Sequence, residues 1–323
     1  MGKEKNKASQ DGWRTTKKER RSYIIGDLGR TLEGYIVTAM MSTFMIFQGI
    51  NMAAVAGAML VVKIIDAFDD VVFGYFVDRI HITEWKAFKK ITGEGKYLPW
   101  YRLTYFLFPI FTALFFCMPL HWPQGAKIGW FFVFYLLYDF TYTLVEVPMQ
   151  SMIVTLTDNI DERNSILQTK TIVNSFATIG AGMIWTISIS EYVGVGIREI
   201  ALLSSLIFFF MMLPMCKGVK EHNTTLANVD PEENEKYTLK DMWNCIKTNK
   251  YLMILLLSTV ITSCLQTGSA VGLLVSYYHF GSSLIMAIPI AISLIPVLIA
   301  QMQTRKLVNR FGKLKVFMVC GVI

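Results

Sequence analysis

Apolar residues in this chain occur in long continuous blocks, separated by shorter polar and charged stretches. A helical block of about 20 apolar residues spans the hydrocarbon core of a bilayer. The pattern therefore predicts an all-α, polytopic membrane protein with eight complete spans and the start of a ninth. The expected spans cover residues 24–48, 55–78, 101–119, 128–156, 166–190, 197–216, 251–278 and 283–304, with a partial span from 316.

The longest polar stretch separates six of these spans from the rest. We expect a basic N-terminal segment (1–22), a six-helix transmembrane bundle (23–216), a linker (217–249) and a partial second bundle (250–323). Because the sequence stops inside an apolar run, we also expect a fragment, or a truncated reading frame, of a longer protein.

Composition and charge distribution agree with a membrane location. The chain is 53% hydrophobic and 17% charged, against about 25% charged residues in soluble domains. The net charge of +7 is unevenly placed: 26 Lys and Arg residues fall on one side of the expected spans and two on the other. Basic loops face the cytoplasm, so the N-terminus is expected there, in a multi-pass protein of the cell membrane. The basic N-terminus is then a determinant of topology, and no nucleic-acid partner is expected.

Signatures of soluble enzymes are missing from the sequence. The five cysteines show no CxxC spacing, the four histidines are isolated, and no HExxH, Walker or GxSxG motif occurs. We therefore expect no catalytic residues, no enzyme activity and no cofactor.

The informative residues are charges inside the expected spans, since each is costly there and indicates a functional site. Lys63, Asp66 and Asp70 share one face of a helix, and Asp69 adds a third acid. Two carboxylates one turn apart repel each other unless a cation or Lys63 compensates them. The pattern predicts either a Na⁺ or H⁺ site at Asp66 and Asp70 or a closed Lys–Asp ion pair that locks helices together.

Charges in other spans reach a similar depth. By helical rise, Glu33, Glu146 and Lys170 lie near the level of Asp70. Transporters bind substrate and coupling ion near the bilayer midplane, so a shared site is predicted there. Asp139 lies seven residues before Glu146, on the same helical face.

Two further charged pairs lie nearer the expected cytoplasmic side. Asp27 and Arg30 are one turn apart and are expected to form either a gate or a simple ion pair. Asp78 and Arg79 end the second span, and Asn309 and Arg310 follow the eighth in a similar arrangement. This weak internal repeat is consistent with tandem six-span halves.

Six segments together carry a family resemblance: Tyr23–Arg30, Lys63–Asp70, Gly95–Trp100, Tyr142–Pro148, Asp161–Arg163 and Asn309–Lys313. They resemble the melibiose-permease-like glycoside–pentoside–hexuronide:cation symporters of the major facilitator superfamily, over nearly the whole chain from residue 20. The resemblance implies two six-helix bundles, of which this chain has the first and part of the second. It also implies alternating access and sugar uptake coupled to Na⁺ or H⁺.

The resemblance also implies roles for individual residues. Asp66 and Asp70 would bind the coupling cation, with Thr143 nearby and Lys63 as the basic residue ahead of them. Glu146 corresponds to the helix-four acid of the family. Lys170 corresponds to a basic residue that contacts sugar.

Departures from the melibiose permease concern mainly the sugar. Thr31, beside Arg30, and Gln150 stand where that permease has a sugar-binding Asp and a sugar-stacking Trp. Asp69 replaces an Asn between the two carboxylates, so the cation site gains a charge. The resemblance then implies substrate contacts at Glu146, Lys170, Arg30, Thr31 and Gln150, and a sugar other than an α-galactoside.

The prediction from the sequence is a monomeric, cation-coupled transporter of a sugar or glycoside, with the lipid bilayer as its other partner. Two alternatives stay open. The chain could be a non-transporting scaffold or sensor built on the same fold, or an inactive fragment of such a transporter.

Overall fold

A computed structural model gives the arrangement of most of the predicted spans. It describes residues 13–79, 92–93, 95–190, 193–222 and 287–312, with short pieces at 244, 247–254, 257–258, 279–280, 285 and 315–316. Most of the predicted linker and of the span expected at 251–278 lie outside these residues. The helices are α1 (Lys17–Phe47), α2 (Met52–Arg79), α4 (Leu98–Thr104), α5 (Leu107–Phe116), α6 (Gln124–Leu156), α7 (Ile160–Ile189), α8 (Ile197–Gly218) and α11 (Ala287–Phe311).

The described residues form helices and connecting turns, without strands. Of the helices described, α6, α7 and α8 are long and apolar enough to cross a membrane. Large apolar side chains remain on the outside of this bundle, among them Ile184 at 64% and Leu203 at 62% exposure. An outer surface of this kind suits lipid, and the prediction of an all-α polytopic protein is confirmed.

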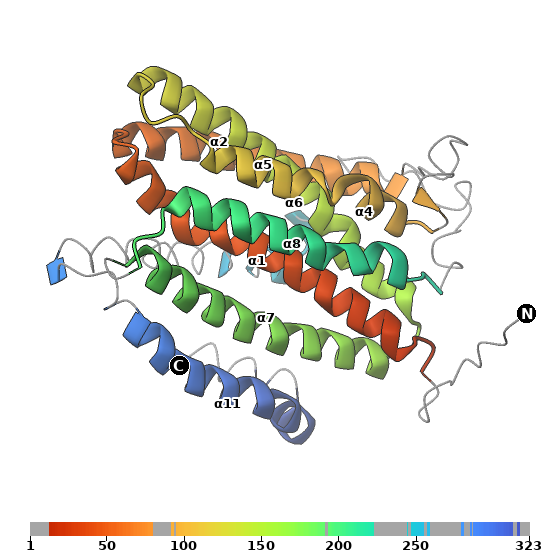
Figure 1. The fold of residues 1–323 in the computed structure, drawn as a ribbon. Helices are drawn as coiled ribbons and strands as arrows, with labels where there is room; N and C mark the ends of the chain where they lie inside the picture. The colour runs from red at the N-terminus through yellow and green to blue at the C-terminus, as the bar shows by residue number, and fades with distance from the viewer. Residues whose placement is uncertain are drawn as a thin grey trace, which may run out of the picture.

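Helix α1 occupies a central position (Figure 1). It packs between α7 and α8; α5 follows beside α8, and α6 lies between α5 and α2. α11 runs along α7 at the edge of the bundle. One end holds the turn after α1, where Lys127 Nζ donates to the Gln48 carbonyl at 2.7 Å. The other end holds the start of α1, where Arg14 pairs with Asp158.

The third predicted span, 101–119, is wrong as a single helix. The structure has two helices there, α4 and α5, joined through Tyr105 and Phe106. Pro109 explains the break, because its ring removes the amide that would bond to the carbonyl of Tyr105 and clashes with that carbonyl. Placed in the first turn of a new helix, the same proline needs no amide partner.

Two glycines allow α1 and α8 to approach closely. A Cβ atom at Gly26 would lie 2.6 Å from Met215 Cβ. At Gly29 it would lie 3.0 Å from both Met211 Cβ and the Phe208 carbonyl oxygen. Small residues at helix contacts are the usual means of close packing in membranes. The face of α1 that bears these glycines therefore packs directly against α8.

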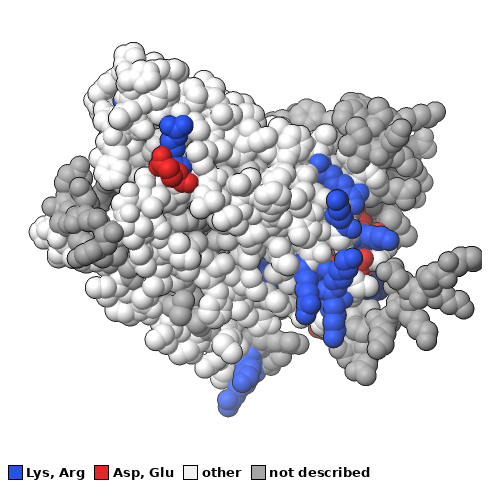
Figure 2. Space-filling model, viewed as in Figure 1, with Lys and Arg blue, Asp and Glu red and all other residues white. Residues whose placement is uncertain are grey.

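The start of α1 is fixed to the start of α7 by a buried carboxylate. Thr16 and Glu19 form a capping box at the first turn of α1. Glu162, which is fully buried, accepts hydrogen bonds from the backbone amides of Arg14 and Thr15 and from the hydroxyls of Thr15 and Thr157. Figure 2 shows that most basic side chains of this face gather at this end, while the middle of the face is uncharged.

Candidate functional site

Polar side chains from α1, α6 and α7 meet inside the bundle. Each helix contributes residues at spacings of three or four, which places them on one face of that helix. They are Asp27, Arg30 and Thr31 from α1; Tyr142, Glu146 and Gln150 from α6; and Lys170 and Asn174 from α7. We call these eight residues the polar network.

Asp27 is the centre of the polar network and is fully buried. Its Oδ1 atom lies 3.1 Å from Lys170 Nζ and 3.5 Å from Arg30 Nη2. Its other oxygen accepts a hydrogen bond from Asn174 Nδ2 at 2.7 Å. The same amide group donates to Thr31 Oγ1 at 3.2 Å. Asp27 thus joins α1 to α7 through an ion pair and a hydrogen bond.

Arg30 joins α1 to α6. Its Nη1 atom lies 3.1 Å from Glu146 Oε1 and donates to the Tyr142 hydroxyl at 3.0 Å. The guanidinium carbon also lies 5.5 Å from the centre of the Tyr142 ring, within the range of a cation–π contact. Arg30 is 5% exposed, so its charge depends on these partners.

The polar network is buried at one edge and open at the other. The side chain of Glu146 is 29% exposed, and Gln150 is exposed. Gln150 accepts from Lys170 Nζ at 3.0 Å and lies within 3.4 Å of Glu146 Oε1. Two cations and two carboxylates make the network formally neutral. An uncharged polyol reaching the open edge would meet carboxylate and amide acceptors next to an ammonium donor.

A proline positions the segment of α6 that carries Glu146. Pro148 lies within the helix and cannot donate to the carbonyl of Leu144, four residues earlier. The hydroxyl of Thr104, from α4, donates to that carbonyl at 3.2 Å. The short helix α4 thereby satisfies a backbone group that the proline leaves free.

Other predicted residues lie elsewhere on these helices. Glu33 is fully buried on the side of α1 that faces α8, where the Ser205 hydroxyl donates to it at 2.7 Å. It does not join the polar network with Glu146 and Lys170. Asp139 and Thr143 are also buried on α6, at 5% and 2% exposure.

The predicted cation site falls on α2, whose backbone is described but whose side chains are described only in part. The side chains of Lys63, Asp66, Asp69, Asp70, Asp78 and Arg79 lie outside the described residues. The helix itself packs against α6, and Phe73 meets Phe140 edge-to-face at 5.8 Å between ring centres. Elsewhere in the described residues, no three His, Cys, Asp or Glu side chains are grouped to hold a metal ion.

Sequence reasoning did not assign a role to Tyr142 or Asn174. Both stand four residues from a predicted site residue, since Tyr142 precedes Glu146 and Asn174 follows Lys170. The helical spacing was therefore available as a signal. Both residues bear polar groups that hydrogen-bond in the network, a tyrosine hydroxyl and an amide.

Comparison with known proteins identifies the family. Residues 22–323 match the family described as MFS/sugar transport protein. The chain belongs to this family. The resemblance to melibiose-permease-like symporters is thereby confirmed, and with it the major facilitator fold of a membrane protein.

Three relatives are 24–27% identical to this chain. An isoprimeverose transporter from Lactiplantibacillus pentosus is 26% identical over 310 residues, which are 91% of this chain and 60% of the relative. The uncharacterised symporter YjmB of Bacillus subtilis (strain 168) is 24% identical over 95% of this chain and 65% of its own length. A glucuronide carrier protein homolog from Escherichia coli (strain K12) is 27% identical over 48% of this chain and 31% of its own. The chain thus spans less than two thirds of the length of these relatives.

The buried pairing of Asp27 and Lys170 makes a prediction about stability. Asp27→Asn leaves the Lys170 ammonium without its carboxylate, and removing one partner of a buried ion pair costs about 3–5 kcal/mol. We expect a clear fall in the free energy of unfolding, measured by thermal denaturation of the purified protein in detergent. Adding Lys170→Gln removes the uncompensated charge and should restore part of the loss.

The control for this pair is Arg198→Gln, an exposed charge in the first turn of α8, which should change stability little. If Asp27→Asn/Lys170→Gln is no more stable than Asp27→Asn, the loss of stability does not come from the unpaired charge of Lys170.

Proposed function

We propose that this protein carries a sugar or glycoside across the cell membrane together with Na⁺ or H⁺, by alternating access. The observation that carries the proposal is the polar network, in which charged residues of three helices meet around an open edge. The substrate would bind at this edge, against Glu146, Gln150 and Lys170. Arg30 and Thr31 lie behind them and would hold these groups in position.

The chemistry of the open edge supports a sugar. Sugar hydroxyls both donate and accept hydrogen bonds, and a site that pairs carboxylate with ammonium offers both kinds of partner. The formal neutrality of the network suits an uncharged substrate, while Lys170 and Arg30 would also accommodate a carboxylate-bearing sugar. Isoprimeverose and a glucuronide, which appear in the names of relatives, are the first substrates to try.

The coupling ion is assigned to α2 because of its sequence. Three acids, Asp66, Asp69 and Asp70, occur with one base, Lys63, within about two helical turns of the sequence, so a bound cation would supply the missing positive charge. Oxygen ligands of this kind suit Na⁺, a hard cation, and a carboxylate can also carry a proton. Packing of α2 against α6 supports a connection to the substrate, since Thr143 and Glu146 belong to α6.

The distribution of basic residues supports a cytoplasmic N-terminus. We expect that a cysteine introduced by Asp230→Cys, in a variant without the five native cysteines, stays unlabelled by a membrane-impermeant maleimide in intact cells. Gly125→Cys, at the opposite end of the bundle, should be labelled in the same cells. Labelling at position 230 without permeabilisation would reverse the proposed orientation.

Glu146 tests the substrate site. Glu146→Gln keeps the size of the side chain but removes the charge that pairs with Arg30, and a sugar hydroxyl loses its strongest acceptor. We expect sugar binding to weaken by about 1–3 kcal/mol. Binding of labelled isoprimeverose or glucuronide to purified protein measures the change. Unchanged affinity for a sugar that the unmodified protein binds would remove Glu146 from the site.

Asp66 and Asp70 test coupling. Asp66→Asn or Asp70→Asn should abolish ion-driven accumulation in membrane vesicles, because the cation loses a carboxylate ligand. Exchange of sugar at equal concentrations should survive at least in part, because the sugar is assigned to other helices. Accumulation is measured with imposed Na⁺ and pH gradients. If the carboxylates only lock helices through Lys63, the variants should instead lose stability while accumulation stays coupled in the protein that folds.

A further inference from the structure

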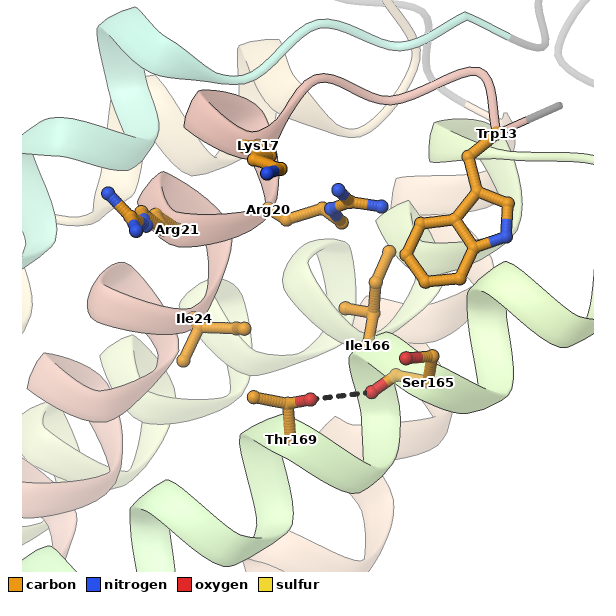
Figure 3. A pocket seen from close by; sticks show the side chains of 8 residues that line it. All are labelled: Trp13, Lys17, Arg20, Arg21, Ile24, Ser165, Ile166 and Thr169. Carbon is orange, nitrogen blue, oxygen red and sulfur yellow. Dashed lines mark hydrogen bonds between the residues drawn. The ribbon is translucent and has the colours of Figure 1, made fainter. Parts of the chain in front are cut away.

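A hollow opens between the beginnings of α1 and α7, outside the polar network. Its volume is about 340 Å³. Figure 3 shows its lining: cationic side chains from the first turns of α1, an indole from the segment before it, and hydroxyl and apolar side chains from α7. We call it the basic pocket; it is lined by Trp13, Lys17, Arg20, Arg21, Ile24, Ser165, Ile166 and Thr169.

Two of the three cations in the basic pocket have no counter-charge among the described residues. Lys17 and Arg21 are exposed, and neither forms an ion pair with any described residue. Arg20 is more enclosed: its guanidinium carbon lies 4.3 Å from the centre of the Trp13 indole. Its Nη1 atom is 3.8 Å from Glu162 Oε1, which is too long for a hydrogen bond.

Glu162 offsets at most one of the three cations of the basic pocket, Arg20. Its two oxygens already accept hydrogen bonds from the hydroxyls of Thr15 and Thr157 and from the backbone amides that precede α1. It is fully buried beneath that segment. The pocket therefore keeps a surplus of positive charge on its accessible side.

The deeper side of the basic pocket is apolar. Ile24 and Ile166 form part of its wall, about two turns into α1 and α7. Ile25, beside Ile24 on α1, is 40% exposed to the surroundings of the bundle. The basic side chains lie at the end of the helices, and the apolar side chains lie one or two turns further in. This order matches a membrane interface, in which lipid headgroups lie outside the acyl chains.

We propose that the basic pocket binds the phosphodiester headgroup of an anionic phospholipid. Lys17 and Arg21 would pair with the phosphate, the Ser165 and Thr169 side chains would border it, and the acyl chains would lie along Ile24 and Ile25. Cationic pockets between helices at the membrane surface bind such headgroups. A bound lipid would tie α1 to α7 at the end where Glu162 already joins them.

The test measures lipid retention by the full chain. The protein is purified in detergent and titrated with phosphatidylglycerol or phosphatidylcholine, and bound lipids are counted by native mass spectrometry. Lys17→Gln/Arg21→Gln should weaken phosphatidylglycerol binding by about tenfold or more. Each basic side chain near an anionic membrane surface contributes to the binding free energy, and the variant removes two of them. Phosphatidylcholine should bind weakly to both proteins. The charge-preserving Lys17→Arg/Arg21→Lys variant should retain binding.

A matched control removes two charges from the same end of the bundle but outside the pocket. Lys18→Gln/Lys217→Gln has the same net charge as Lys17→Gln/Arg21→Gln. Lys18 and Lys217 are both exposed. Equal loss in the two double variants would overturn the proposal, because it would show only general attraction to anionic lipid. Displacement of phosphatidylglycerol by equimolar glycerol phosphate would also overturn it, because the site would then prefer a soluble anion.

Discussion

The charges buried between α1, α6 and α7 are the constraint on which the rest of the structure depends. Moving an ion from water into a membrane protein costs several kcal/mol unless partners surround it. Asp27 meets this requirement through Lys170 and Asn174, and Arg30 through Glu146 and Tyr142. A shift of one residue along any of the three helices moves its side chains by about 1.5 Å and turns them by about 100°, which breaks these contacts. The polar network therefore fixes the register of three helices at once.

The polar network thereby also fixes the position of the opposite face of α1, which packs against α8. Gly26 and Gly29 let α8 approach the helix, so that contact is made by backbone and methionine side chains. Glu33 is buried on this side as well and is held by Ser205. Helix α1 is consequently enclosed by protein on two sides, which explains how a segment with Asp27, Arg30 and Glu33 can cross a bilayer. A helix with the same charges facing lipid would be far less stable.

The sequence was sufficient for what depends on local spacing. Apolar block lengths located the spans that correspond to α1, α2, α6, α7, α8 and α11, and spacings of three and four placed Asp27 with Arg30 and identified the acids of α2. Spacing does not tell which neighbouring helix a face meets. The pairing of Arg30 with Glu146 joins residues more than a hundred positions apart, and Glu33 turned toward α8 although its depth resembled that of Glu146. The break between α4 and α5 could have been inferred from Pro109, but the apolar run concealed it.

The proposed sugar and cation sites differ in charge, and this difference bears on how they could be coupled. The polar network is formally neutral, so a neutral sugar can enter or leave without changing its electrostatic balance. The acids of α2 outnumber their base, so that helix gains from a cation. Helix α6 connects the two: Phe140 packs on Phe73 of α2, while Glu146, six residues later and on a different face, pairs with Arg30. On this proposal, ion binding changes the position of α2 against α6. That change would rotate or displace Glu146 and so alter the open edge of the polar network, where the sugar is proposed to bind. Coupling would then need no direct contact between sugar and ion.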